Sequence, residues 1–163
     1  MTVTAAVQDA EARTLTMTAE YAAPVERVWR MWADPRLLER WWGPPTYPAT
    51  VVEHDLAPGG TVRYFMTGPE GDTHHGWWRV LTVQAPHSLE FEDGFADADG
   101  NPNPDLPVTR GVVTLEPLED ERTRMTIVST YPSAEAMAQV MAMGMVEGIT
   151  AAMNQIDGLL AEG

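Results

Sequence analysis

The stretch that decides the fold is AEAMAQVMAMGMVEGITAAMNQIDGLLA, residues 134–161. It contains no proline, and its apolar residues recur near helical spacing, which predicts an amphipathic helix. Pro132 ends the segment before it, and Ser133 is a suitable N-cap. At about 1.5 Å per residue, the helix would be on the order of 40 Å long, enough to cross a whole sheet.

Two features of this predicted helix allow two interpretations each. Gly144 and Gly148 each weaken a helix by about 1 kcal/mol relative to alanine, so either a neighbouring element packs closely there or space is left for a ligand. The methionines either pack in the core or line an adaptable apolar pocket, because methionine is flexible and polarizable. The same helix face would serve both purposes.

The residues before the helix predict seven strands and two short helices. Alternating apolar and polar residues indicate the strands, and turn sequences such as Pro58-Gly59-Gly60 separate them. Pro24 suits the first position of one short helix, and Asp34-Pro35 suits the N-cap and first position of the other. The predicted strands are residues 14–22, 50–56, 62–67, 75–83, 88–93, 108–118 and 122–131. Helices segregated from an antiparallel sheet indicate an α+β fold whose long helix covers one sheet face.

Composition narrows the class of protein. The chain has 163 residues and a formal net charge of −14, from 24 acidic residues and 10 basic ones, all arginine. Such a surface repels nucleic-acid phosphates and anionic lipids, so we expect no nucleic acid and no membrane as partner, although the charge also serves solubility. Cysteine is absent. Neither a signal peptide nor an apolar run of about 18 residues is present, so we expect a cytoplasmic protein.

We expect one domain over residues 14–163, preceded by a flexible lead-in at residues 1–13, which is polar and rich in alanine. A chain of this length buries roughly 70% of its unfolded surface, so it can fold alone. Exposed tryptophan could form a weak dimer patch, so both a monomer and a weak homodimer remain open.

Several spaced motifs resemble the START-like, or SRPBCC, superfamily, and within it the activator of heat-shock protein 90 ATPase-like group. The resemblance covers residues 14–161 and is carried by Ala23-Pro24-Val25-Glu26-Arg27-Val28-Trp29 with Trp32, Asp34-Pro35, Trp41-Trp42-Gly43-Pro44, Pro58-Gly59-Gly60 and Gly144-Met145-Val146-Glu147-Gly148. It implies a helix-grip fold: a seven-stranded antiparallel sheet wrapped around the C-terminal helix, with a pocket between them.

The resemblance leaves three functions open. The first is binding of a small apolar or aromatic molecule, as in the family's lipid and hormone carriers. The second is a polyketide cyclase or dehydratase-like enzyme, and the third is a co-chaperone-like domain that stimulates an ATPase. Chaperone activators of this group carry an additional N-terminal domain, for which 163 residues leave no room, so we expect a small-molecule partner before a chaperone. No cofactor is expected.

Parity along each strand selects the residues expected to line the pocket. In the pairs Trp41-Trp42 and Trp77-Trp78 neighbouring side chains diverge, and we expect Trp41 and Trp78 to face inward. The full predicted set is Trp41, His54, Tyr64, Met66, Trp78, Phe91, Val113, Met125, Met137, Met141 and Met145.

His54 and Tyr64 are the candidates for chemistry. Histidine alone titrates unperturbed near neutral pH, so His54 is either an acid–base group or a satisfied structural residue. Tyr64 and Arg79 could bind a ligand carbonyl or carboxylate. No metal is expected, since the rings of His74 and His75 point apart in a strand. Residues 97–105 lack the terminal ligands of a calcium loop, and we interpret them as a flexible loop that gates the cavity.

Overall fold

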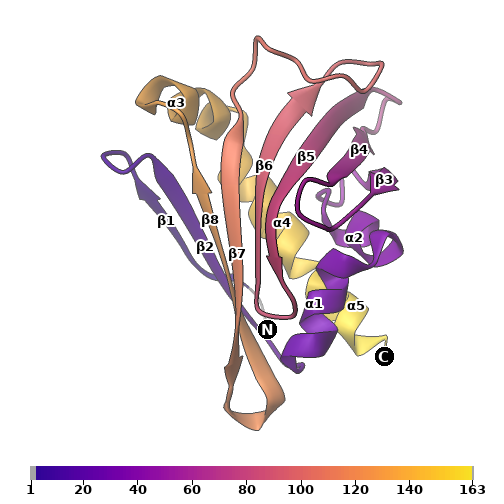
Figure 1. The fold of residues 1–163 in the computed structure, drawn as a ribbon, viewed down its shortest axis with the longest axis vertical. Coiled ribbons are helices and arrows are strands. Elements are labelled where there is room, and N and C mark those ends of the chain that lie inside the picture. Colours follow the sequence, from indigo (N-terminus) through magenta and orange to yellow (C-terminus); the bar gives the residue numbers. More distant parts are fainter. Residues whose placement is uncertain (1–2, 163) are drawn as a thin grey trace.

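The computed structural model describes residues 3–162 and shows one antiparallel sheet with helices packed across one of its faces (Figure 1). The strands lie in the order β1-β2-β8-β7-β6-β5-β4-β3, so β8 returns beside β2 and β3 forms the far edge. The strands are β1 (Val3–Asp9), β2 (Thr14–Tyr21), β3 (Ala49–His54), β4 (Thr61–Thr67), β5 (Thr73–Gln84), β6 (Ser88–Ala96), β7 (Thr109–Leu118) and β8 (Arg122–Thr130). The predicted α+β antiparallel architecture is confirmed.

The sheet has eight strands, whereas the sequence predicted seven. The additional strand, β1, lies in the segment predicted to be a flexible lead-in, and it pairs with β2 so that Asp9 lies opposite Thr14. Beyond Val3 every residue of β1 is exposed, so the strand is held by its backbone ladder. Because an edge strand that buries no face needs no apolar alternation, its sequence carries no strand pattern.

The two short helices follow β2 as predicted and differ only in detail. α1 (Val25–Ala33) buries one apolar face, and Pro24 occupies its N-cap position instead of the first helical turn. α2 (Pro35–Trp41) has Asp34 as its N-cap, and the Asp34 carboxylate accepts a hydrogen bond of 2.9 Å from the backbone N–H of Arg36. The capping satisfies a backbone donor that would otherwise lack a partner at the helix start.

The C-terminal segment is three helices, not the single straight helix that periodicity predicted. They are α3 (Ala134–Ala142), α4 (Met145–Asn154) and α5 (Ile156–Ala161), and the axis bends by 62° between residues 142 and 145. Gly144 lies at the bend with φ +83°, a left-handed conformation that glycine adopts without a Cβ penalty. Its N–H donates to the carbonyl of Met141, as at a helix C-terminus. Helical spacing continues through the break, so periodicity could not reveal it.

The bend divides the C-terminal segment between two places. α4 and α5 cross one face of the sheet, while α3 lies at the end near the β1–β2 hairpin (Figure 1). Within residues 3–162 no single helix is long and apolar enough to cross a membrane, although α3 and 145–161 together would pass by length and composition.

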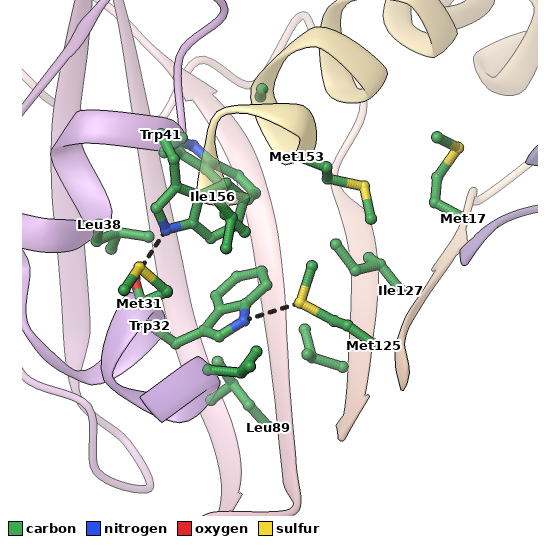
Figure 2. Close-up of a cluster of buried hydrophobic side chains, with 14 of the residues drawn as sticks. Met17, Met31, Trp32, Leu38, Trp41, Leu89, Met125, Ile127, Met153 and Ile156 are labelled. Carbon is green, nitrogen blue, oxygen red and sulfur yellow. Dashed lines mark hydrogen bonds between the residues drawn. The ribbon is translucent and has the colours of Figure 1, made fainter. Parts of the chain in front are cut away.

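One part of the interface between the sheet and the helices is a buried core of aromatic, methionine and aliphatic side chains (Figure 2). Trp32 of α1 is fully buried, and its Nε1 donates to the sulfur of Met125 at 3.3 Å. The ring of Trp41 meets it edge-on at 4.8 Å between centroids, and Trp41 Nε1 donates to the carbonyl of Met31 at 2.8 Å. Both indoles therefore have their apolar surface packed and their N–H groups satisfied.

Candidate functional site

A cavity of about 280 Å³ lies between the sheet and the bend at Gly144. This volume is near the lower limit of small-molecule sites in proteins. The wall combines methionine and aromatic side chains with few polar groups. It is formed by Leu15, Met17, Trp42, Pro44, Tyr64, Met66, His74, His75, Phe91, Asp93, Gly94, Phe95, Thr109, Gly111, Ile127, Ser129, Tyr131, Val140, Met143, Gly144, Met145, Gly148 and Ile149.

The space exists because the helix side of the wall contains glycine. A Cβ atom at Gly148 would meet no atom within 4 Å, so the residue faces open volume. At Gly144, the bend turns α3 away from the course that α4 takes. The structure therefore agrees with the second interpretation of these glycines: they leave space and do not pack closely against a neighbouring element.

Glycine on the sheet side positions the aromatic wall. A Cβ atom at Gly76 would lie 2.4 Å from the ring of Tyr64, so only glycine lets that ring lie across β5. In the same way, Phe91 lies over Gly111 of the neighbouring strand, 3.1 Å from where a Cβ would be. Phe91 also stacks on Trp78, with ring centroids 4.2 Å apart. These contacts fix the orientation of the rings before any ligand arrives.

One polar pair interrupts the apolar wall. The Tyr64 hydroxyl donates a hydrogen bond of 3.2 Å to Oδ1 of Asp93. Burial raises the pKa of Asp93 to about 7, against the opposing effect of the Tyr64 hydrogen bond. Burial and the Asp93 charge also hold the pKa of Tyr64 well above its usual value, and they raise the pKa of Tyr131 to about 12. The cavity therefore holds a carboxyl group that titrates near neutral pH.

Two indole N–H groups complete the surroundings of the pair. Nε1 of Trp42 and Nε1 of Trp78 are buried without a hydrogen-bond partner of good geometry among the described residues. Both rings lie beside Tyr64, with centroids 6.1 Å (Trp42) and 6.4 Å (Trp78) from that of the tyrosine.

The structure brings four of the predicted site residues to the cavity wall: Tyr64, Met66, Phe91 and Met145. The other apolar candidates lie elsewhere. Trp41, Trp78, Val113, Met125 and Met137 are buried in the core without lining the cavity, and Met141 packs against the core from a half-buried position. Periodicity identified the buried face correctly, but it could not separate core from cavity wall.

His54 lies away from the cavity, contrary to its predicted position. The register of β3 shifts between Val51 and Glu53, and Val52 is 63% exposed although it has the same parity as His54. Nε2 of His54 lies 3.0 Å from the carbonyl oxygen of Trp32, a contact in which the nitrogen is the donor. Arg79 is exposed and does not reach the cavity. His54 pairs with Val62, which is fully buried, so it lies on the inner face of the sheet as predicted, but beside α1 and outside the cavity.

Sequence reasoning missed Asp93 and Trp42. Asp93 shares the inward parity of Leu89 and Phe91 on β6, so the signal was present: an acidic residue continuing a buried face. Trp42 lines the cavity in place of Trp41, because α2 ends at Trp41 and the chain turns there. No pattern in the sequence distinguishes the two tryptophans.

The remaining polar candidates lie in the 97–105 loop and at its ends. Within residues 3–162, no group of three or more histidine, aspartate or glutamate side chains is placed to hold a metal ion. In the 97–105 loop the Asp97 carboxylate accepts hydrogen bonds from the backbone N–H groups of Asp99 and Asn101. This carboxylate therefore stabilises the turn. Phe95 and Thr109, on either side of the loop, line the cavity, whereas no residue from 97 to 105 does.

An antiparallel sheet that encloses a cavity against a C-terminal helix defines the START-like, or SRPBCC, class of fold. Residues 22–161 match the model of the family "Activator of Hsp90 ATPase homolog 1-like protein". The chain belongs to this family. No curated protein matches the sequence significantly.

Solved structures agree with this assignment. Protein Ms6760 from Mycobacterium smegmatis is 56% identical over 97% of this chain and 96% of its own, with a TM-score of 0.90. A protein from Arthrobacter aurescens, solved by NMR, is 52% identical over 99% of this chain and 94% of its own, with a TM-score of 0.95. DynU16, a protein in the dynemicin biosynthetic locus, shares the fold at 20% identity, covering 88% of this chain and 47% of its own, with a TM-score of 0.62.

Proposed function

We propose that the protein binds a small apolar or aromatic molecule in the cavity beneath the bend at Gly144. The observation that carries the proposal is the contrast on α4, where Gly148 faces open space while Ala152 and Met153 of the same helix are buried. Aromatic and methionine side chains around this space suit an apolar ligand, since they supply flat and adaptable surfaces. Transfer of such a ligand from water is favoured by roughly 25 cal/mol per Å² of apolar surface buried.

A matched pair of glycines makes the test specific. Gly148 and Gly158 both lie in C-terminal helices, and a Cβ atom at either would meet nothing within 4 Å. Gly148 lines the cavity, whereas Gly158 is exposed to solvent. Leucine at Gly148 therefore fills the proposed site, and leucine at Gly158 makes the same chemical change outside it.

The experiment titrates the neutral fluorescent probe N-phenyl-1-naphthylamine into the wild type, Gly148→Leu and Gly158→Leu. We expect saturable binding by the wild type and Gly158→Leu, and a loss of at least tenfold in affinity for Gly148→Leu. Equal binding by all three proteins would place the probe elsewhere and contradict the proposal.

A second candidate, an enzyme of the polyketide cyclase or dehydratase kind, is favoured by the Tyr64–Asp93 pair. A carboxyl group with a pKa of about 7 in an apolar cavity can exchange protons with a bound substrate at neutral pH. His54, placed outside the cavity, has no part in this version. The test is formation of an aromatic product from a linear polyketide thioester, with loss of turnover in Asp93→Asn; absence of any product in the wild type would contradict it.

The chaperone activity in the family's name rests on that name alone. No contact among residues 3–162 favours it over ligand binding. If it holds, the protein should raise the ATPase rate of the chaperone. An unchanged rate would leave the small-molecule proposal intact.

A further inference from the structure

The cavity wall has a one-sided charge. Among the described residues that line it, Asp93 is the only acidic one, and no arginine is present. The chain contains no lysine at all. Histidine is the remaining residue type that can carry a positive charge, and His74 and His75 line the cavity. His74 is exposed and already pairs with the Asp72 carboxylate at 2.9 Å.

Asp93 has a single neutral partner. Oδ1 accepts from Tyr64, while the structure gives Oδ2 no partner within residues 3–162. A carboxylate in apolar surroundings is stable only when it is protonated or paired with a cation. No arginine or lysine lines the cavity, so Asp93 either keeps its proton or pairs with a cation that comes from outside.

The aromatic rings near Asp93 and the net charge of the protein also favour a cationic ligand. Trp42, Tyr64, Phe91 and Tyr131 line the same cavity, and the face of an aromatic ring attracts positive charge. The Tyr64 proton is directed to Asp93, so the pair presents acceptor character to the ligand. A net charge of −14 raises the local concentration of cations and lowers that of anions around the whole molecule.

We infer that the ligand is an apolar amine, whose ammonium group pairs with Asp93 while its apolar body fills the space beneath Gly148. This inference rests on the proposed ligand-binding function and names its ligand class. Fatty acids and aromatic carboxylates, which bring a second negative charge to Asp93, are excluded by it.

The test compares three naphthalenes of nearly equal shape: 2-naphthylmethylamine, 2-naphthalenemethanol and 2-naphthoate. Isothermal titration calorimetry at pH 7.5 should give the amine at least tenfold higher affinity than the alcohol, and no binding of the carboxylate. Equal affinities for the alcohol and the amine would overturn the inference that the ligand is an amine, but they would still support an apolar binding site. Failure of all three, together with the neutral probe, would contradict the proposed function itself.

Two variants locate the preference. Asp93→Asn should remove the advantage of the amine and leave the affinity for the alcohol within about threefold. Tyr64→Phe keeps the carboxylate, so the preference for the amine should persist. Retention of the amine preference in Asp93→Asn would overturn the role of Asp93. Binding of the alcohol by each variant shows that its cavity has formed.

The pH dependence provides an independent readout. The titratable groups on the cavity wall are Asp93, Tyr64, Tyr131, His74 and His75. Between pH 6 and pH 8 Asp93 ionises, and this change favours an ammonium ligand. The amine affinity should therefore rise by about tenfold over this range in the wild type, and the alcohol affinity should stay constant. An amine affinity that falls with pH would overturn the inference.

Discussion

The two ends of the interface between sheet and helices use the same residue types for different purposes. At the core end, Met125 and Met153 are fully buried, and Trp32 Nε1 bonds to the sulfur of Met125 (Figure 2). At the cavity end, Met143 is 52% exposed and Met145 is half-buried beside open space. Residue type alone therefore does not decide whether a methionine packs or lines a site.

The backbone makes the difference. At the core end α4 and α5 carry Met153 and Ile156 against the sheet, leaving no space beneath them. At the cavity end Gly144 bends the chain and Gly148 omits a side chain. These two glycines thus leave a cavity along part of one apolar face, and they lower the stability of the helices that contain them.

The largest expected effect is at the core end. Trp32→Ala removes a fully buried ring and should lower the free energy of unfolding by roughly 3–5 kcal/mol. Met145→Ala, at the half-buried cavity wall, should lower it by about 1 kcal/mol or less, because less packing is lost. Urea denaturation measures both values. Similar losses in the two variants would mean that the cavity end is packed as tightly as the core.

Asp93 should give the next largest effect, through pH. The unfolded carboxyl ionises near its ordinary pKa of 3.8, whereas the folded group keeps its proton to about pH 7. The folded state therefore binds the extra proton between these values, and its contribution to stability, complete below pH 3.8, is lost as pH rises to 7. Because the group borders a cavity, we expect this loss to be roughly 2–3 kcal/mol.

Asp93→Asn isolates this contribution. Its free energy of unfolding should fall less than that of the wild type as pH rises from 4 to 7, and it should be the more stable protein at pH 8. Asp99→Asn, in the exposed 97–105 loop, serves as the control and should follow the wild type. A wild-type curve that matches Asp93→Asn would show that Asp93 is solvated as an ordinary carboxyl.

The sequence predicted more of the fold than of the site. Seven strands, both short helices and the Ser133 cap follow from local patterns, and each agrees with the structure, where Ser133 Oγ accepts from the N–H of Ala136 at 3.0 Å. β1 escaped prediction because its pairing uses backbone groups, which leave no side-chain pattern. The bend escaped because α3 and α4 keep helical spacing on either side of Gly144.

Parity predicted the inner face of the strands, but only part of the cavity wall. On β4 and β6, inward parity placed Tyr64, Met66 and Phe91 correctly on the wall, and it would have placed Asp93 there too. On β3 the same argument placed His54 on the inner face, where it pairs with the buried Val62, but it lies beside α1 and not at the cavity. Which inward residues border space and which border other side chains depends on distant packing, as Val113 and Met125 show.

The smallest expected effect distinguishes helix stability from cavity space. Gly158→Ala and Gly148→Ala should each raise the free energy of unfolding by about 0.5–1 kcal/mol, since alanine is the better helix former and both sites have room. Only Gly148→Ala should also weaken ligand binding. Thermal unfolding with and without 2-naphthalenemethanol measures both effects, and a destabilising Gly148→Ala would reveal close packing there.

The central claim is that ligands enter the space beneath α4, and amide NMR tests it most directly. On titration of ¹⁵N-labelled protein with 2-naphthylmethylamine, we predict shifts of the Gly148, Gly94 and Gly111 amides and of the Trp42 indole N–H, all from residues on the cavity wall. The indole signals of Trp32 and Trp41 in the closed core should move far less. Shifts confined to the exposed strand β1, or no shifts at all, would contradict the account.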